Sequence, residues 1–313
     1  MRALITGVAG FIGSTLAERL VSLGHDVVGV DCFTDYYPRP LKEANLASLR
    51  ESPRFRFVEA DIVNTDLKAL LDGAEVVFHQ AAQAGVRASW GFTFESYVHH
   101  NVLGTQMLLE AIKQSSGVRR VVYASSSSIY GDTTDLPMRE NSLPKPYSPY
   151  GVTKLAAENL CELYRNNFGV QAVSLRYFTV YGPRQRPDMG FNKFIRSMLA
   201  GSPLQIFGNG KQTRDFTFID DIVDANLAAA EQGNASGIYN IGGGSRVTLM
   251  EVLETLSSIV GTPLSLEHLP EQAGDVRHTE ADTSRARSDL GYAPKVGLRE
   301  GLTREVEWLR SAG

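Results

Sequence analysis

The sequence predicts an α/β protein in which a doubly wound parallel sheet is followed by a smaller α+β domain. Short apolar stretches alternate with helical patterns up to about residue 178, and a glycine-rich turn follows the first of these stretches. The alternation weakens after Phe191. Buried strands that alternate with helices are typical of a parallel sheet covered on both faces. The 313 residues are enough to form two packed regions with a large core.

Composition narrows the classes of function. The net charge of -4 and the lack of a strongly basic run argue against nucleic acid as the main partner. No apolar stretch approaches the length of a membrane span, and the N-terminus reads as a first strand rather than a signal peptide. The two cysteines, Cys32 and Cys161, belong to no metal-spaced motif. We therefore expect a cytoplasmic protein in a reducing compartment, without a membrane partner or a structural metal.

The first βαβ unit spans residues 3–31. A short apolar strand, Ala3–Ile5, leads into a glycine-rich turn and a helix, and the second strand, Val27–Val30, ends at Asp31. Closely spaced glycines allow the backbone to approach a pyrophosphate, the helix N-terminus favours its charge, and the later acid accepts hydrogen bonds from a ribose. We expect a Rossmann-type unit that binds NAD rather than NADP, because Asp31 would repel a 2′-phosphate. The candidate cofactor residues here are Gly7, Gly10, Phe11, Ile12, Gly13 and Asp31.

The third and fourth strands are expected over 55–58 and 76–79, after a helix over 41–49. Ligands of doubly wound sheets bind at the carboxyl ends of the strands. Asp61 and Ile62 follow the third strand and would flank an adenine, although Asp61 could instead cap a helix. Small residues follow the fourth strand and would let a sugar and a phosphate lie against the backbone. The candidates there are Gln80, Ala81, Ala82 and, for a phosphate, Arg87.

Two polar residues of this half are expected to have structural roles. His79 leads out of a buried strand and is expected to be a hydrogen-bonded core histidine rather than a catalyst. Asn101 interrupts the apolar pattern of a long helix expected over 98–112, and we expect its side chain to hold a backbone group.

The fifth strand, 121–124, is followed by four consecutive serines, and the sixth is expected over 171–176. Between them, the segment 148–154 begins a helix, because Ser148 is a favourable N-cap and proline suits the next position. Tyr150 and Lys154 are four residues apart and share one face of that helix. The helix dipole and the lysine charge would both lower the pKa of the phenol, so Tyr150 is a candidate proton acceptor near neutral pH.

With these features in this order, the chain resembles the extended short-chain dehydrogenase/reductase family over nearly its whole length. The segments 125–131, 148–154 and 176–183 look like those of nucleotide-sugar 4-epimerases. The resemblance implies that C4 of the sugar is oxidised transiently to a ketone and that hydride then returns to the opposite face. Tyr150 would remove the proton of the 4-hydroxyl, with Ser126 sharing the hydrogen bond. Lys154 and Tyr177 would contact the NAD, and Ser127 the sugar.

The residues that follow Ser126 separate the relatives. Sugar-nucleotide 4,6-dehydratases carry an Asp-Glu pair there and UDP-xylose synthases a Glu nearby, whereas this chain has Ser127 and Ser128. The segments 84–90 and 178–189 look most like UDP-glucuronate 4-epimerases. A 4-keto glucuronate loses carbon dioxide when its C5–C6 bond aligns with the carbonyl π system. The resemblance therefore implies that Arg186 and Thr179 hold the carboxylate. Arg186 could instead bind a phosphate or form a surface ion pair.

Three other functions stay open: a UDP-glucose/UDP-galactose 4-epimerase, a UDP-glucuronate decarboxylase, and a non-catalytic NAD-binding sensor. UDP-glucose 4-epimerases typically have Asn where Thr179 lies, which favours the sugar with a carboxylate. A sensor would not need Ser126, Tyr150 and Lys154 together, yet all three are present.

The resemblance also assigns the second region. We expect residues 1–178 and 219–242 to form the NAD-binding domain, and residues 179–218 and 243–313 to form the domain that binds the UDP sugar. The implied substrate contacts there are Asn192 and Arg214 with the diphosphate, Gln205 and Phe207 with uracil, and Asp275 with the uridine ribose. Phe207 could instead be ordinary core, and Arg214 could pair with Asp215. Because the family pairs its subunits through two long helices, a homodimer is expected through Leu103, Met107, Leu155 and Leu160.

Overall fold

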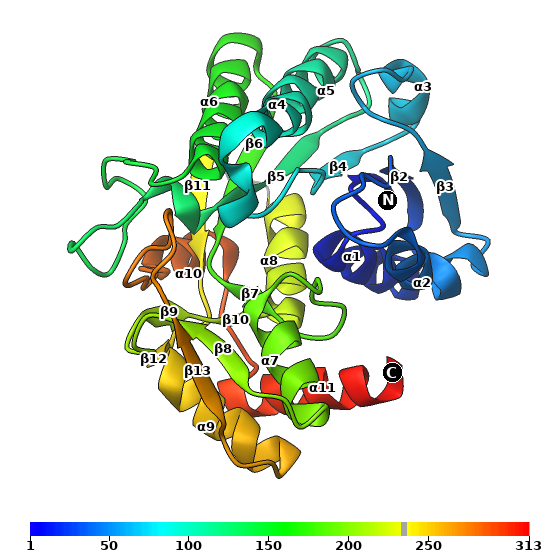
Figure 1. Ribbon diagram of the computed structural model, residues 1–313. Helices are drawn as coiled ribbons and strands as arrows, with labels where there is room; N and C mark the ends of the chain where they lie inside the picture. Colours follow the sequence, from blue (N-terminus) through cyan, green and yellow to red (C-terminus); the bar gives the residue numbers. More distant parts are fainter. Residues whose placement is uncertain (233–236, 313) are drawn as a thin grey trace.

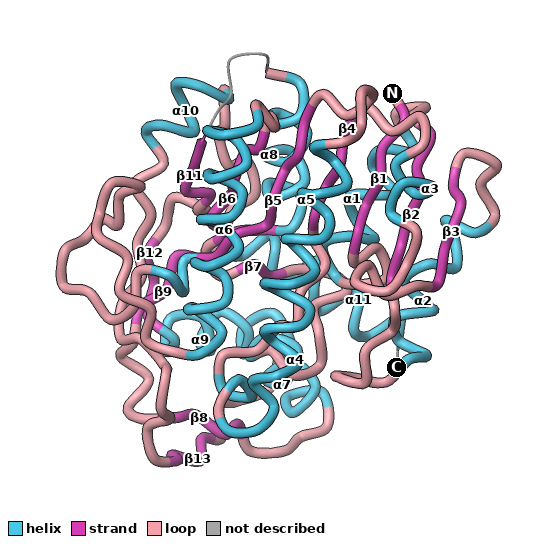
Figure 2. Tube along the Cα trace, turned by 90° about the horizontal axis from the view of Figure 1, so that it is seen from above, coloured by secondary structure: helices cyan, strands magenta, loops and turns pink. Residues whose placement is uncertain are grey.

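The computed structural model describes residues 1–232 and 237–312. Its centre is a parallel sheet of seven strands in the order β11-β6-β5-β4-β1-β2-β3. Figure 2 shows these strands side by side in that order. The strands are β1 (Arg2–Thr6), β2 (Asp26–Asp31), β3 (Phe55–Glu59), β4 (Val76–His79), β5 (Arg120–Ser126), β6 (Ala172–Tyr177) and β11 (Gly237–Ile241). The predicted α/β class with a doubly wound parallel sheet is confirmed.

Helices cover both faces of this sheet (Figure 1), since successive side chains of a strand point to opposite sides. Ala3 and Ile5 of β1 belong to one buried core and Leu4 between them to another. The first core includes residues of α1 (Phe11–Ser22), α2 (Arg39–Arg50) and α8 (Ile219–Glu231). The second includes residues of α3 (Leu67–Leu71), α5 (Gly104–Lys113) and α6 (Pro149–Phe168). Within the described ranges, no helix combines the length and the apolar character that a membrane span requires.

The long helix predicted over 98–112 is not uniform. It consists of α4 (Phe94–Tyr97), a π-helical segment η3 (Val98–Leu103) and α5. Val98 and Leu103 are 40% and 41% exposed, so these two residues do not pack in the core as the apolar spacing suggested. Three short 3₁₀ segments complete this half: η1 (Arg87–Ser89), η2 (Gly91–Thr93) and η4 (Ser127–Ile129).

The chain leaves the sheet after β6 and forms a smaller group of elements, which lies below the sheet in Figure 1. Three two-stranded sheets pair β7 (Val180–Tyr181) with β10 (Thr217–Phe218), β8 (Leu204–Phe207) with β13 (Leu266–Leu269), and β9 (Thr213–Asp215) with β12 (Arg246–Thr248). The helices are α7 (Gly190–Leu199), α9 (Leu249–Val260), α10 (Ser284–Leu290) and α11 (Leu298–Ala312). Phe191, Leu253 and Leu302 of this group belong to the same buried core as Ala3 and Ile5. The main sheet and the smaller group are therefore packed around shared apolar side chains.

Strand β11 was not predicted, although its residues fall in the range assigned to the NAD-binding domain. After β10 the chain returns through α8 and adds β11 to the main sheet beside β6. It then leaves the sheet again to form β12 and α9. The main sheet is consequently built from two separate stretches of the chain.

Candidate active site

The turn after β1 brings three backbone segments into close contact. A Cβ atom on Gly7, which has φ +70°, would lie 2.7 Å from the backbone of Ala81. A Cβ atom on Gly13 would lie 2.2 Å from the carbonyl oxygen of Gly7. In the described structure no side chain caps α1, so the amides of its first turn are available to an anion. These features fit the diphosphate of a dinucleotide.

A pocket extends along the carboxyl edge of the sheet, from the ends of β2 and β3 to the ends of β5 and β6. Neighbouring strands lie about 4.8 Å apart, so a pocket that crosses six of them suits an extended two-nucleotide molecule. Every residue that the sequence analysis named for the cofactor lines this pocket. They are Gly7, Gly10, Phe11, Ile12, Gly13, Asp31, Asp61, Ile62, Gln80, Ala81, Ala82, Tyr150, Lys154 and Tyr177.

The two acids occupy the end of the pocket near β2 and β3. Asp31 accepts hydrogen bonds from the amides of Phe33 at 2.8 Å and Ala9 at 3.1 Å, and burial raises the pKa of its carboxyl. Asp61 accepts from the amide of Val63 at 2.9 Å and lies 2.8 Å from Nε2 of His99. Asp61, His99 and His100 form a group of possible metal ligands, whose ligand atoms lie within 4.8 Å of one another.

Tyr150 lies in the first turn of α6, as predicted, because the Ser148 hydroxyl caps the helix by accepting from the Gly151 amide at 3.1 Å. The predicted direction of its pKa shift was wrong. Burial raises the pKa of the phenol, although the hydrogen bond with Ser126 and the charge of Arg186 oppose this increase. Tyr150 and Ser126 are therefore brought together, and a proton on the phenol is favoured in this structure.

Lys154 shares a face of α6 with Tyr150, but its ammonium is directed to strand β5. Nζ donates to the carbonyl oxygen of Ala124 at 2.5 Å and lies 4.5 Å from the ring centre of Tyr123. Burial lowers the pKa of this lysine to about 7. The spacing of four residues correctly placed both side chains on the pocket wall, but it did not show where the flexible lysine would point.

The serine run is anchored by an acid that the sequence analysis missed. Ser125 donates to Oε2 of Glu158 at 2.6 Å, and Glu158 forms a buried bidentate pair with Arg176 at 2.7 and 3.0 Å. Arg176 also donates to the hydroxyl of Tyr130 at 2.6 Å. This network holds the ends of β5 and β6 against α6. Spacing gave a signal, because Glu158 follows Lys154 by four residues and so lies on the face of α6 that carries Tyr150.

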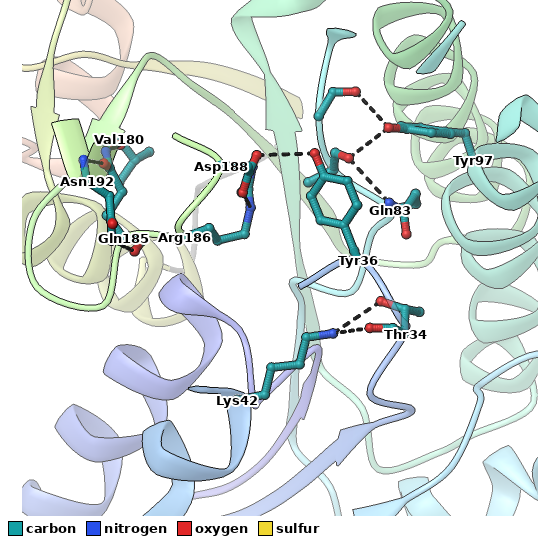
Figure 3. Close-up of polar contacts among 12 residues, drawn as sticks. Thr34, Tyr36, Lys42, Gln83, Tyr97, Val180, Gln185, Arg186, Asp188 and Asn192 are labelled. Carbon is teal, nitrogen blue, oxygen red and sulfur yellow. Dashed lines mark hydrogen bonds and ion pairs between the residues drawn. The ribbon is translucent and has the colours of Figure 1, made fainter. Parts of the chain in front are cut away.

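Arg186 comes from the loop between β7 and α7 and also lines the pocket. Its Nε and Nη2 atoms lie 2.9 and 3.0 Å from the two oxygens of Asp188. The hydroxyl of Tyr36, which also lines the pocket, donates to Asp188 at 3.1 Å (Figure 3). Arg186 thus forms an ion pair, which was one of the alternatives, but its guanidinium lines the pocket.

The three residues expected to bind the uridine of the substrate, Gln205, Phe207 and Asp275, lie outside this pocket, close to Arg87. The carboxylate of Asp275 accepts hydrogen bonds from Arg87 at 2.6 and 3.3 Å. The guanidinium of Arg87 lies 4.1 Å from the ring centre of Phe207, which is only partly buried. Gln205, two residues earlier in β8, is exposed and donates to Glu267 at 3.0 Å.

Other predicted substrate residues have partners within the chain. Asn192 donates to the carbonyl of Gln185 at 2.7 Å (Figure 3). Arg214 donates to the carbonyls of Thr213, Val276 and Arg277 rather than pairing with Asp215. The carbonyl of Thr179 accepts from the amide of Thr217 at 2.9 Å, and the carbonyl of Ser127 from that of Tyr130 at 3.1 Å. These bonds engage three of the five N–H donors of Arg214 and one of the two on Nδ2 of Asn192.

The two structural predictions for polar residues are confirmed. His79 lies between the hydroxyls of Thr6 and Thr105, at 2.7 and 2.9 Å, and burial lowers its pKa to about 3. Asn101 accepts from the amide of Gln83 at 2.7 Å and donates to its carbonyl at 3.1 Å. Asn101 thereby holds the backbone of a residue that lines the pocket.

Several pocket residues were missed because they follow no motif. Lys42 of α2 donates to the carbonyl of Thr34 at 2.5 Å, and Gln83 lies beside Tyr97 (Figure 3). The residues of the pocket wall that the sequence analysis did not name for it include Thr34, Tyr36, Tyr37, Lys42, Gln83 and His100. Most of them belong to the loop after β2 and to the helices, where no strand end predicts a position.

The chain is similar to known proteins over its whole length. The NAD dependent epimerase/dehydratase family matches residues 3–242. A UDP-glucuronate 4-epimerase of Thermodesulfobacterium geofontis is 40% identical, covering 97% of this chain and 95% of that protein. A UDP-glucose 4-epimerase of Mycolicibacterium smegmatis is 40% identical, covering 99% of each. The solved structure of UDP-glucuronic acid 4-epimerase from Bacillus cereus, in complex with UDP-glucuronic acid and NAD, is 44% identical with a TM-score of 0.97 and 100% coverage of both chains.

Proposed function

This chain belongs to the NAD dependent epimerase/dehydratase family, and from that premise we propose that it inverts C4 of a UDP-hexose, preferably converting UDP-glucuronate to UDP-galacturonate. The enzyme is an isomerase whose cofactor is NAD. The observation that carries the substrate preference is the guanidinium of Arg186 in the wall of the pocket that also holds Tyr150. A cation at this place suits a sugar with a carboxylate.

The roles proposed for the catalytic residues follow from their positions. When bound, NAD supplies the acceptor for a hydride from C4 and later the donor that returns it. Tyr150 takes the proton of the 4-hydroxyl and gives it back, and Ser126 shares the hydrogen bond. Lys154 holds the cofactor ribose. Because burial raises the pKa of Tyr150, the chemistry depends on the opposing contacts from Ser126 and Arg186.

For the substrate, we propose that Ser127, Thr179 and Arg186 bind the sugar. A carboxylate held by Arg186 and Thr179 keeps the C5–C6 bond out of line with the C4 carbonyl of the ketone and so prevents loss of carbon dioxide. The further contacts that we propose are Arg87, Asn192 and Arg214 with phosphate, and Gln205, Phe207 and Asp275 with the uridine.

A second candidate is a UDP-glucose/UDP-galactose 4-epimerase. The identity to the Mycolicibacterium smegmatis enzyme, 40%, equals that to the UDP-glucuronate 4-epimerase of Thermodesulfobacterium geofontis. Arg186 does not exclude this substrate, because the pair that it forms with Asp188 has no net charge.

One experiment separates these functions. The purified protein is incubated with UDP-glucuronate and with UDP-glucose in separate tubes, and the products are identified by NMR. We expect UDP-galacturonate as the main product. UDP-galactose alone would select the second candidate, a UDP-pentose a decarboxylase, and no product with either sugar a non-catalytic protein. The matched control is Tyr150→Phe, which should lose nearly all turnover while it still binds UDP; unchanged turnover would remove Tyr150 from the mechanism.

The organisation of the protein is also proposed. Residues 1–178 and 219–242 form the NAD-binding domain, and residues 179–218 and 243–313 the UDP-sugar-binding domain.

We propose a homodimer through η3, α5 and α6, since Leu103, Met107, Val152 and Leu163 on these elements are 39–55% exposed. Leu155 and Leu160 are partly buried against the core and contribute less to that surface. Cys32 and Cys161 are free thiols, which suits a reducing cytoplasm, and the net charge of -4 suits a partner other than nucleic acid.

A further inference from the structure

We propose that Asp188 is a positioning residue that aims the guanidinium of Arg186 at the sugar and thereby sets the preference for a carboxylate. This inference rests on the proposed function.

The geometry of the pair defines which edge of the guanidinium a ligand can use. Asp188 takes the side edge of Arg186, through Nε at 2.9 Å and Nη2 at 3.0 Å. Arginine has five N–H donors in a planar fork. The side-edge pair therefore leaves the end edge, made by Nη1 and the second N–H of Nη2, for another carboxylate. Arg186 lines the pocket and its charge acts on the phenol of Tyr150, so this edge serves the site where the sugar reacts.

Asp188 is itself held by a second loop. Tyr36, from the loop after β2, donates to Asp188 at 3.1 Å. Tyr36 packs directly against Gly85: a Cβ atom added to this glycine would lie only 2.1 Å from the hydroxyl oxygen of Tyr36. Gly85 and Ala84 are fixed in turn, because the hydroxyl of Tyr97 lies 2.8 Å from both of their carbonyl oxygens (Figure 3). Asp188 therefore has a defined position before a ligand arrives.

The charges of Asp188 and Arg186 cancel, so we expect Asp188 to orient Arg186 rather than to strengthen its attraction for an anion. Burial acts to raise the pKa of the Asp188 carboxyl, but the Arg186 guanidinium holds it below its ordinary value, so Asp188 is ionised at neutral pH. The pair has no net charge and attracts an anion only through the N–H groups that it aims. A sugar without a carboxylate does not use those groups. Loss of Asp188 should therefore affect the two classes of sugar differently, whereas a merely structural role would affect both alike.

The test measures binding in a background that cannot turn over. Asp188→Asn is introduced into the NAD-loaded Tyr150→Phe protein, and the Kd values of UDP-glucuronate, UDP-glucose and UDP are measured by calorimetry. We expect the affinity for UDP-glucuronate to fall about tenfold, the effect of one charge-assisted hydrogen bond. The affinities for UDP-glucose and UDP should change by no more than about twofold. Tyr36→Phe should produce a smaller loss with the same selectivity, because it removes the donor that holds Asp188.

Two controls make the result decisive. Asp26→Asn removes a carboxylate from an exposed pair with Arg54 and should leave all three affinities unchanged. Asp188→Glu keeps the charge and should retain part of the preference for UDP-glucuronate. Equal losses for all three ligands, or an unchanged or tighter Kd for UDP-glucuronate, would overturn the role of Asp188. Failure of the wild-type protein to epimerise UDP-glucuronate would overturn the proposed function, and this outcome is separate because the Kd values do not depend on turnover.

Discussion

At the residue scale, Tyr150 and Lys154 both have pKa values that burial shifts away from their ordinary values. Tyr150 and Lys154 face the same space, and burial shifts the pKa of each toward its neutral form. The role of base that we propose for Tyr150 would benefit from a lowered pKa of the phenol instead. The side chains that oppose the effect of burial, Ser126 and Arg186, come from β5 and from the loop after β7. The pKa of Tyr150 therefore depends on residues far from it in the sequence.

The lowered pKa of Lys154 predicts a pH dependence of stability. In the folded protein without NAD this pKa is about 7, and in the unfolded chain it returns to 10.5. Between these values the unfolded chain binds more protons, so the free energy of unfolding rises with pH, by at most about 1.4 kcal/mol per pH unit. Lys154→Met removes this contribution. Urea unfolding of both proteins at pH 7.5 and 9.5 should show the wild type gaining stability relative to the variant; parallel changes would contradict the shifted pKa.

The sequence predicted the pocket residues at strand ends better than those in loops. Residues such as Gly7, Asp31 and Gln80 stand at strand ends, where the topology of a doubly wound sheet brings them to one edge. Tyr36 and Asp188 stand in loops 152 residues apart, and no periodicity indicates that they touch. The pKa of Tyr150 was mispredicted for a related reason, because the extent of burial and the direction of a flexible lysine depend on packing across the whole pocket.

At the scale of elements, β5, β6 and α6 support the residues that we propose for catalysis. The buried pair between Glu158 and Arg176 joins α6 to β6, and Ser125 joins β5 to the same carboxylate. The side chains of the pair are 1% and 2% exposed, so the charges have little access to water. A displacement of this pair would move Tyr150 and Ser126 relative to one another.

Removing one partner of this pair should be costly. Glu158→Leu leaves the Arg176 guanidinium buried without its acid, and we expect a loss of about 3–5 kcal/mol in the free energy of unfolding. The double variant with Arg176→Met removes both charges and should recover most of that loss. Urea unfolding of the wild type and the two variants measures both changes. A single variant as stable as the wild type, or a double variant no more stable than the single one, would contradict a dominant charge effect.

Prediction of elements succeeded where apolar patterns were long. The first six strands of the main sheet were placed within three residues at either end, since each is an apolar run next to a helical pattern. Strands β7, β9, β10 and β12 have two or three residues each, too few to show an alternation. Strand β11 was missed for a different reason. It carries Asn240, whose buried side chain donates to the carbonyl of Met138, so a polar residue interrupts an otherwise apolar run.

At the scale of the whole molecule, the proposed dimer can be tested by its mass. The double variant Leu103→Glu with Met107→Glu places charges on exposed apolar positions of η3 and α5. We expect the wild type to elute as a dimer and the variant as a monomer, measured by size exclusion with light scattering. Leu199→Glu on α7, which replaces another exposed leucine, is the control and should stay dimeric. A monomeric wild type, or a variant that still dimerises, would contradict this surface.

The return of the chain to form β11 limits how parts of this protein can be exchanged with those of its relatives. The elements below the sheet are inserted on both sides of one strand, so neither part of the protein is a single contiguous fragment. Exchange between relatives of the elements that we propose to bind the substrate would need three junctions, one after β6 and one on each side of the α8–β11 segment. A gene fusion that simply appended such elements to an ancestral dinucleotide-binding sheet would not yield this arrangement. Recombination between relatives should therefore tend to keep the whole chain together, and new specificities should arise by substitution in the loops.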